Sequence, residues 1–199
     1  MGILTVEQIV SADGYAASRD GGLEFFAVTE GGTEGGDNDG ADAADNDQLS
    51  FLEGVDAILL GANTYRMFAD YWPAADAQQE PVAEPINALP KLVFSNSLTA
   101  APWGDQAAEI VAGEAADAVR ALKDRFDHII VWGSLQLTFA LFEASMVDRL
   151  RLRVVPALLG FGRSFTPSSM DLTRLELDHS VAHPRGQVTL DYRVRRGQS

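Results

Sequence analysis

Short hydrophobic runs alternate with amphipathic stretches through the first two thirds of the chain. The runs predict strands over residues 3–10, 55–60, 91–95, 109–112 and 128–132. Between them, the spacing of apolar positions predicts helices over 48–53, 63–69, 115–126 and 135–144. Strands without polar alternation are typical of a parallel sheet that helices cover on both faces. The pattern therefore predicts the α/β class.

The C-terminal third has a different pattern, a period of two. Apolar residues alternate with charged ones over 149–154, 175–178 and 188–195, and the residues His183 to Gly186 favour a turn between the last two. These segments predict antiparallel strands added to the mostly parallel sheet. The arginine rows in them are explained most simply by cross-strand pairing with Glu176, Asp178 and Asp191. The alternative is a phosphate-binding patch.

An acidic, glycine-rich stretch interrupts the first part of the chain. Residues 30–47 read EGGTEGGDNDGADAADND and contain no large apolar side chain. Such a stretch has little surface to bury, so it predicts a mobile surface loop. A calcium loop is the alternative, but Asp37, Asp39 and Gly40 match only a fragment of that pattern. We expect one domain over residues 1–199 that carries this loop.

Charge and composition exclude several classes of function. The 199 residues include 15 basic and 29 acidic side chains, for a net charge of −14, which disfavours a nucleic-acid partner. There is no cysteine, and the three histidines lack metal-ligand spacing, so no metal site is expected. No run approaches the ~20 apolar residues of a membrane helix, and no targeting segment is evident. We expect a cytoplasmic protein without a membrane partner.

Two glycines stand where a buried strand passes directly into a helix. Gly61 is followed by Ala62, Asn63 and Thr64, and Gly133 is followed by Ser134. The first N–H groups of a helix have no intrahelical partner and lie at the positive end of its dipole. Two such helix starts at neighbouring parallel strands would hold a pyrophosphate. The alternative is a pair of ordinary strand-to-helix turns, because neither matches a GxGxxG or Walker pattern.

Five short motifs occur in a familiar order. They are Ser11-Ala12-Asp13-Gly14, Leu60-Gly61-Ala62-Asn63-Thr64-Tyr65, Pro90-Lys91-Leu92-Val93-Phe94-Ser95, Val131-Trp132-Gly133-Ser134, and Val147-Asp148 with Pro156-Ala157-Leu158-Leu159-Gly160-Phe161-Gly162. Together they resemble the dihydrofolate-reductase-like family, in the branch of the riboflavin biosynthesis reductase (RibD C-terminal) domain. The resemblance covers most of the chain and implies a three-layer sandwich with a mostly parallel central sheet and antiparallel C-terminal strands.

The resemblance also implies an activity, a cofactor and a set of site residues. The activity is hydride transfer from NADPH, with NADH possible, to a small pterin-, pyrimidine- or flavin-precursor-like heterocycle, in a homodimer that associates through the C-terminal strands. The implied catalytic residues are Glu24 and Asp13, although Glu24 is equally well explained as a solvated loop residue. The implied cofactor-binding residues are Ala12, Gly14, Gly61, Ala62, Asn63, Thr64, Ser95, Asn96, Gly133, Ser134, Leu135 and Gln136.

Three positions depart from the family pattern. Ala62 stands in place of an arginine, Ser134 in place of a second glycine, and Arg149 in place of a glutamate. The first change removes a charge-assisted phosphate contact. It leaves open the alternative of a non-catalytic ligand-binding or interaction protein on a reductase scaffold with a degraded cofactor site.

Overall fold

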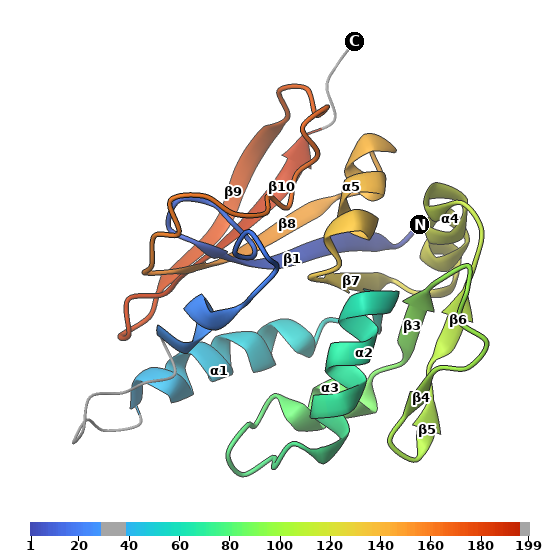
Figure 1. Ribbon diagram of the computed structural model, residues 1–199, viewed down its shortest axis with the longest axis horizontal. Coiled ribbons are helices and arrows are strands. Elements are labelled where there is room, and N and C mark those ends of the chain that lie inside the picture. The colour runs from blue at the N-terminus through green and yellow to red at the C-terminus, as the bar shows by residue number, and fades with distance from the viewer. Residues whose placement is uncertain (29–38, 196–199) are drawn as a thin grey trace.

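The structure, a computed structural model, describes residues 1–28 and 39–195 and is built on one large sheet (Figure 1). Within those residues the sheet has eight strands in the order β6-β3-β2-β7-β1-β8-β10-β9. Their bounds are β1 Ile3–Ser11, β2 Ala57–Gly61, β3 Lys91–Phe94, β6 Glu109–Val111, β7 His128–Trp132, β8 Arg149–Val155, β9 Arg174–Ala182 and β10 Val188–Arg195. A separate two-stranded hairpin pairs β4 Pro102–Trp103 with β5 Gln106–Ala107.

Strand direction follows the two hydrophobic patterns of the sequence. β1 pairs in parallel with β7 and β8, and β2 pairs in parallel with β7 and β3. β10 is antiparallel to both β8 and β9. The strands predicted from continuous apolar runs occupy the sheet from β6 to β1, and the alternating strands β8, β10 and β9 occupy the other end. This is the mixed sheet that the sequence predicts.

Five α-helices complete the layers within the described part of the chain. They are α1 Asp39–Leu52, α2 Ala62–Tyr71, α3 Ala83–Ala88, α4 Ala115–Arg125 and α5 Leu135–Glu143. On one face of β2, Leu59 packs in a core that α4 and α5 complete. On the other face, Ile58 and Leu60 pack in a core that takes Leu52 from α1 and Ile86 from α3. The result is a three-layer sandwich (Figure 1). Short 3₁₀ helices, η1 Glu24–Val28 and η2 Trp72–Ala74, join these layers.

The acidic stretch differs from its prediction as a loop. Residues 29–38 lie outside the described part of the chain, but from Asp39 onwards the backbone is helical and continuous with the short helix expected at 48–53. Ala44 and Gln48 are buried against the sheet, and the Asp47 carboxylate pairs with Arg151 of β8 at 2.5 Å. This helix is thus held by contacts with the sheet, which its composition alone does not reveal. Helix α3 was likewise not expected within 71–89; it buries Ala83 and Ile86.

The C-terminal arginines pair as the simpler explanation predicts. Arg151 binds Asp191 across the β8–β10 pair at 2.7 Å. Arg193 binds Glu176 at 3.0 Å and Asp178 at 2.8 Å across the β10–β9 pair. These arginines therefore neutralise acids on neighbouring strands and do not form a phosphate patch. In addition, no helix among residues 1–28 and 39–195 has the length and apolar character of a membrane span.

Candidate ligand-binding site

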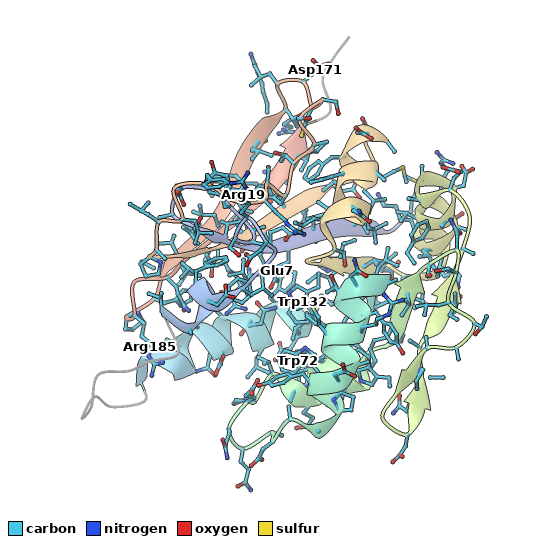
Figure 2. The ribbon with its side chains drawn as sticks, viewed as in Figure 1. Glu7, Arg19, Trp72, Trp132, Asp171 and Arg185 are labelled. Atoms are coloured by element: carbon cyan, nitrogen blue, oxygen red, sulfur yellow. The ribbon has the colours of Figure 1, made fainter. Side chains whose placement is uncertain are left out.

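A cavity of ≈1250 Å³ lies where the parallel strands end. Its wall includes Gly61 and Phe94, the last residues of β2 and β3, together with Trp132 at the end of β7 and Val155 at the end of β8. The carboxyl ends of parallel strands are the usual place for a ligand in an open α/β sheet. In Figure 2, Trp132 and Glu7 lie next to each other at the middle of the sheet.

The two glycine-led helix starts meet at one end of the cavity. β2 and β7 are neighbours in the sheet, so α2 and α5 begin side by side. The Gly61 N–H donates to Ser134 Oγ at 2.8 Å, and the Ser134 N–H donates to Thr64 Oγ1 at 3.1 Å. The common location expected from the sequence is therefore observed, and direct hydrogen bonds fix it.

These hydrogen bonds require an unusual backbone at the start of α5. Gly133 and Ser134 both have a positive φ, 55° and 54°, and for serine this conformation costs on the order of 1 kcal/mol. The Ser134 hydroxyl accepts from Gly61 and donates to the Trp132 carbonyl at 2.9 Å, which offsets the strain. The resemblance implied that Ser134 binds the cofactor, whereas the structure engages its hydroxyl within the protein. The first N–H groups of a helix have no intrahelical partner, so those of the turn that begins at Leu135 are the candidate donors to a ligand.

Most of the expected cofactor-binding residues line this cavity. They are residues 61–64, Ser95, Asn96 and residues 133–136. Ser95 Oγ accepts from the Leu98 N–H at 3.1 Å, and Asn96 Oδ1 accepts from the Gly113 N–H at 2.8 Å, so both side chains also hold the loop after β3. Ala12 and Gly14 are exposed in the turn after β1 and do not line the cavity. Ala16 and Ala17, slightly further along, line it instead.

The two carboxylates expected to be catalytic lie elsewhere. Asp13 is exposed and accepts from the N–H groups of Leu159 at 3.1 Å and Gly160 at 2.7 Å. The Ser11 hydroxyl and these amides lower its pKa. Glu24 is exposed at the start of η1, with its carboxylate folded over Gly22. Neither side chain lines the cavity, so their placement gives no support to a catalytic role.

Two other carboxylates line the cavity within the described residues, Asp45 of α1 and Glu80. The Tyr71 hydroxyl donates to Glu80. Sequence analysis missed Asp45 because it placed residues 30–47 in a solvated loop. The direction in which a side chain points cannot be predicted in such a loop. A helix fixes the direction of each side chain, and that direction points Asp45 into the cavity.

A buried polar cluster lies beneath the other end of the cavity. Glu7 of β1 is 0% exposed, and its carboxylate accepts from Trp132 Nε1 at 2.7 Å and from Gln48 Nε2 at 3.2 Å. Arg151 Nε lies 3.4 Å from it. Sequence analysis missed Glu7, although a charged residue in a strand expected to be buried on both faces was a usable signal.

The basic side chains that line the cavity lie away from the helix starts. Of the lysines and arginines that the structure describes, three line it: Arg153 of β8, Arg163, and Arg185 in the turn between β9 and β10. None belongs to residues 61–64, 94–96 or 133–137, which surround the helix starts. The cavity therefore has a neutral end, whose donors are backbone N–H groups, and a charged end, which carries the arginines.

Three aromatic side chains, from α2, η2 and β7, form an aromatic wall of the cavity. Phe68 of α2 packs edge-on against Trp132 at 5.7 Å and against Trp72 at 6.0 Å between ring centroids. All three line the cavity. Such a surface suits the face of a planar ring. No group of three or more metal-ligating side chains occurs in the part of the chain that the structure describes.

Solved structures share this fold over nearly the whole chain. A protein attributed to riboflavin biosynthesis in Shewanella sp. PV-4 superposes with a TM-score of 0.73 at 19% identity, covering 98% of this chain and 99% of the other. A pyrimidine reductase-like protein of Corynebacterium diphtheriae gives 0.59 at 19% identity, with 98% and 93% covered. Dihydrofolate reductase of Enterococcus faecalis, solved with NADP(H), gives 0.59 at 13% identity, with 98% and 97% covered. The three-layer sandwich is thus dihydrofolate-reductase-like, as the sequence predicts.

A comparison with the curated proteins found no significant match. The family model described as the RibD C-terminal domain, in contrast, matches residues 3–189. That span runs from the first residue of β1 into the start of β10 and includes both helix starts and the other seven strands of the sheet in full. The chain therefore belongs to the RibD C-terminal domain family.

Proposed function

We propose that this protein is a reductase that uses NADPH, or NADH, to reduce a small heterocyclic substrate. One observation carries the proposal: two helix starts, coupled by the Gly61–Ser134 and Ser134–Thr64 hydrogen bonds, open into one end of a cavity of ≈1250 Å³. Family membership and the likeness to a dihydrofolate reductase solved with NADP(H) support it.

The residues at the neutral end fit the diphosphate of a dinucleotide. N–H groups of the first turns of α2 and α5 would bind its oxygens, at the positive ends of two helix dipoles. Ala62 adds no charge there, so this binding relies on the backbone. When bound, the nicotinamide supplies the hydride, and the protein positions the substrate and excludes water.

The charged end and the aromatic wall then receive the substrate. Phe68 and Trp132 would pack against its ring, and Asp45 is the cavity carboxylate that we assign to proton transfer. A reduced C=N or C=C bond needs a proton at the atom next to the one that accepts hydride, and a positioned carboxyl group can deliver it. In this proposal Asp45 takes the role first expected of Glu24 and Asp13.

Titration with NADPH and with NADH tests the cofactor assignment. Trp132 lines the cavity, so tryptophan fluorescence should report binding, and calorimetry gives an independent affinity. Saturation by at least one dinucleotide is expected. Absence of binding of either at millimolar concentration would contradict the proposal and favour a non-catalytic ligand-binding protein. The substrate class is then tested by the loss of nicotinamide absorbance with pterin-, pyrimidine- and flavin-precursor-like compounds, with an Asp45→Asn variant as control.

We also infer a homodimer. β9 is the outer strand of the sheet, and its Leu175 and Leu177 are exposed. Exposed apolar side chains on an outer strand are typical of an association surface. Light scattering should give twice the mass of the chain, and a Leu177→Lys variant should be monomeric. A monomeric wild type contradicts this inference and leaves the cofactor assignment untouched.

A further inference from the structure

Arg153 occupies an unusual position at the charged end of the cavity. In β8 it lies between Ile9 of β1 and Thr189 of β10. Its side chain is 22% exposed and lines the cavity. Among the residues that the structure describes, its guanidinium makes no hydrogen bond, and its ion pair is a 4.0 Å contact with Glu7 Oε1. A guanidinium at the wall of a cavity, with N–H groups that no protein acceptor binds, can donate to a ligand.

Arg151, two residues earlier on the same face of β8, provides the contrast. It is 3% exposed, donates to Asp191 at 2.7 Å and 2.9 Å, and donates to Asp47 at 2.5 Å. Its guanidinium is therefore anchored by two carboxylates within the protein. The same strand thus presents one arginine with a structural role and a second whose donors face the cavity.

Glu7 connects Arg153 to the aromatic wall. Its Oε1 accepts from Trp132 Nε1 at 2.7 Å and lies 4.0 Å from the Arg153 guanidinium. The indole and the guanidinium thus lie on either side of one carboxylate oxygen that is completely buried. A planar ligand whose face lies against Trp132 would bring its edge toward Arg153.

The net charge of the cluster around Glu7 and Arg153 limits the chemical groups that the edge of the ligand can carry. Arg151 and Arg153 together face three carboxylates, those of Glu7, Asp47 and Asp191, and Glu7 lies within 4.0 Å of both guanidinium groups, so the two positive charges are neutralised. A neutralised guanidinium retains its N–H donors but has little net charge to attract a phosphate. Carbonyl oxygens of a ring, with or without one delocalised negative charge, match such a donor set better.

We propose that Arg153 recognises the carbonyl-bearing edge of a planar heterocycle, with Glu7 as the positioning residue for both Arg153 and Trp132. This inference rests on the proposed function and assigns to that site the side chain that distinguishes a carbonyl-bearing ring from one without carbonyl groups. Arg153 would donate through two N–H groups to the two lone pairs of one ring carbonyl oxygen.

Binding of two matched probes tests this assignment. Quinazoline-2,4-dione and quinazoline share a bicyclic shape and differ in the two carbonyl groups. Calorimetry on the full chain, with and without NADPH, should show the dione binding at least tenfold more tightly than quinazoline, about 1.4 kcal/mol. Arg153→Met should remove this preference and leave the affinity for quinazoline and for the dinucleotide unchanged.

Three further variants separate recognition from folding. Arg153→Lys keeps the charge beside Glu7 and should still weaken dione binding several-fold, because a lysine cannot donate bidentately. Arg149→Met, on the same strand but outside the cavity lining, should bind the dione like the wild type. Glu7→Gln should weaken dione binding and also shift the emission of Trp132, a change that loss of Arg153 alone would not cause.

Several results would overturn the inference. They are no dione binding to the wild type at millimolar concentration, equal affinity for dione and quinazoline, and dione binding that survives both changes of Arg153. If low millimolar inorganic phosphate displaced the dione from the wild type but not from Arg153→Met, the ligand of Arg153 would be an anion instead. Dinucleotide titrations are independent of these outcomes. Failure of the proposed function would appear as a wild type that binds neither NADPH nor NADH.

Discussion

The two ends of the cavity offer hydrogen-bond donors from different parts of the chain. At the neutral end the donors are backbone N–H groups, placed by β2, β7 and the helices that follow them. At the charged end the donors are arginine side chains, held by carboxylates from distant segments such as Glu7 and Asp47. The first end depends on local backbone conformation, and the second depends on how the sheet is assembled. Substitutions should therefore act differently at the two ends.

The largest effect is expected from Glu7→Gln, which removes the charge at the base of the charged end. Breaking a buried ion pair by removing one partner typically costs 3–5 kcal/mol, so we expect a loss of about 3 kcal/mol in the free energy of unfolding. Urea denaturation measures it. Glu176→Gln removes an exposed partner of Arg193 and should cost less than about 1 kcal/mol. Equal losses in the two variants would mean that Glu7 has no special structural role.

A smaller effect is expected at the neutral end, from Ser134. Ser134→Ala leaves the Gly61 N–H without its acceptor and keeps a strained φ, so a loss of about 1–3 kcal/mol is expected. Ser134→Gly loses the same hydrogen bonds but relieves the strain, and should be roughly 1 kcal/mol more stable than the alanine variant. Ser145 also has a φ of 54° and does not line the cavity, so it is the matched control.

At Ser145, glycine should again be more stable than alanine, with no change in dinucleotide affinity. At Ser134 the affinity should fall in both variants, because the hydrogen bond from the Gly61 N–H to Ser134 Oγ, one of the two that couple the helix starts, is lost. Thermal denaturation and dinucleotide titration together measure the two effects. Unchanged affinity in Ser134→Ala would show that the coupling is irrelevant to binding.

The third prediction makes the two ends more alike by placing an arginine at the neutral end. Ala62→Arg should tighten binding of the dinucleotide by about tenfold and make it more sensitive to salt, through a charge-assisted phosphate contact. Ala144→Arg adds the same charge at the far end of α5 and should change neither property. An Ala62→Arg variant indistinguishable from Ala144→Arg would contradict placement of the phosphates at α2.

The smallest effect concerns the pH dependence of the charged end. Burial lowers the pKa of His183, which contacts Asp47 at 3.8 Å and accepts or donates a hydrogen bond with Thr189 at 2.9 Å. Below pH 6.5 the unfolded chain binds a proton that the folded protein does not, so stability falls as the pH falls through this range. His183→Asn should reduce this loss by less than about 1 kcal/mol.

Urea denaturation between pH 7 and pH 5 measures the change in slope. Burial also lowers the pKa of His128, which contributes a loss of the same sign, so some slope should remain in the His183 variant. His128→Asn should remove that remaining part. An unchanged slope in His183→Asn would show that His183 is protonated equally in both states.

The comparison also explains what the sequence revealed. The strand at 128–132 was predicted with the bounds that the structure has, because four consecutive buried apolar residues, 129–132, form a local signal that needs no knowledge of the neighbouring strands. Both helix starts were found for the same reason, since glycine after a buried strand is a local signal. The neutral end of the cavity could therefore be predicted almost entirely from the sequence.

The charged end could not be predicted from local sequence patterns, because its contacts join segments far apart in the chain. The alternation over 149–154 gives the face on which Arg153 lies, but its contact with Glu7 exists because β8 pairs with β1, more than 140 residues earlier. Helix α1 was missed from Asp39 to Asp47 because the ion pair with Arg151 is a tertiary contact. Asp13 and Glu24 were placed in the site by resemblance, and the structure uses Asp13 to hold another loop.

The loop that contains Gly160 is also joined by backbone hydrogen bonds to the segment after β1, and this limits how the charged end can change. The Ala16 N–H donates to the Arg163 carbonyl at 2.9 Å, and the Arg163 N–H donates to the Ala17 carbonyl at 2.8 Å. The Asp13 carboxylate also accepts from the Gly160 N–H. The segments 13–17 and 160–163, separated by some 145 positions, are therefore hydrogen-bonded to each other along the rim of the cavity. A change of length in either segment would displace Arg163 and Ala17 together. Evolution of ligand preference at this rim is thus constrained to exchange side chains rather than to insert or delete residues.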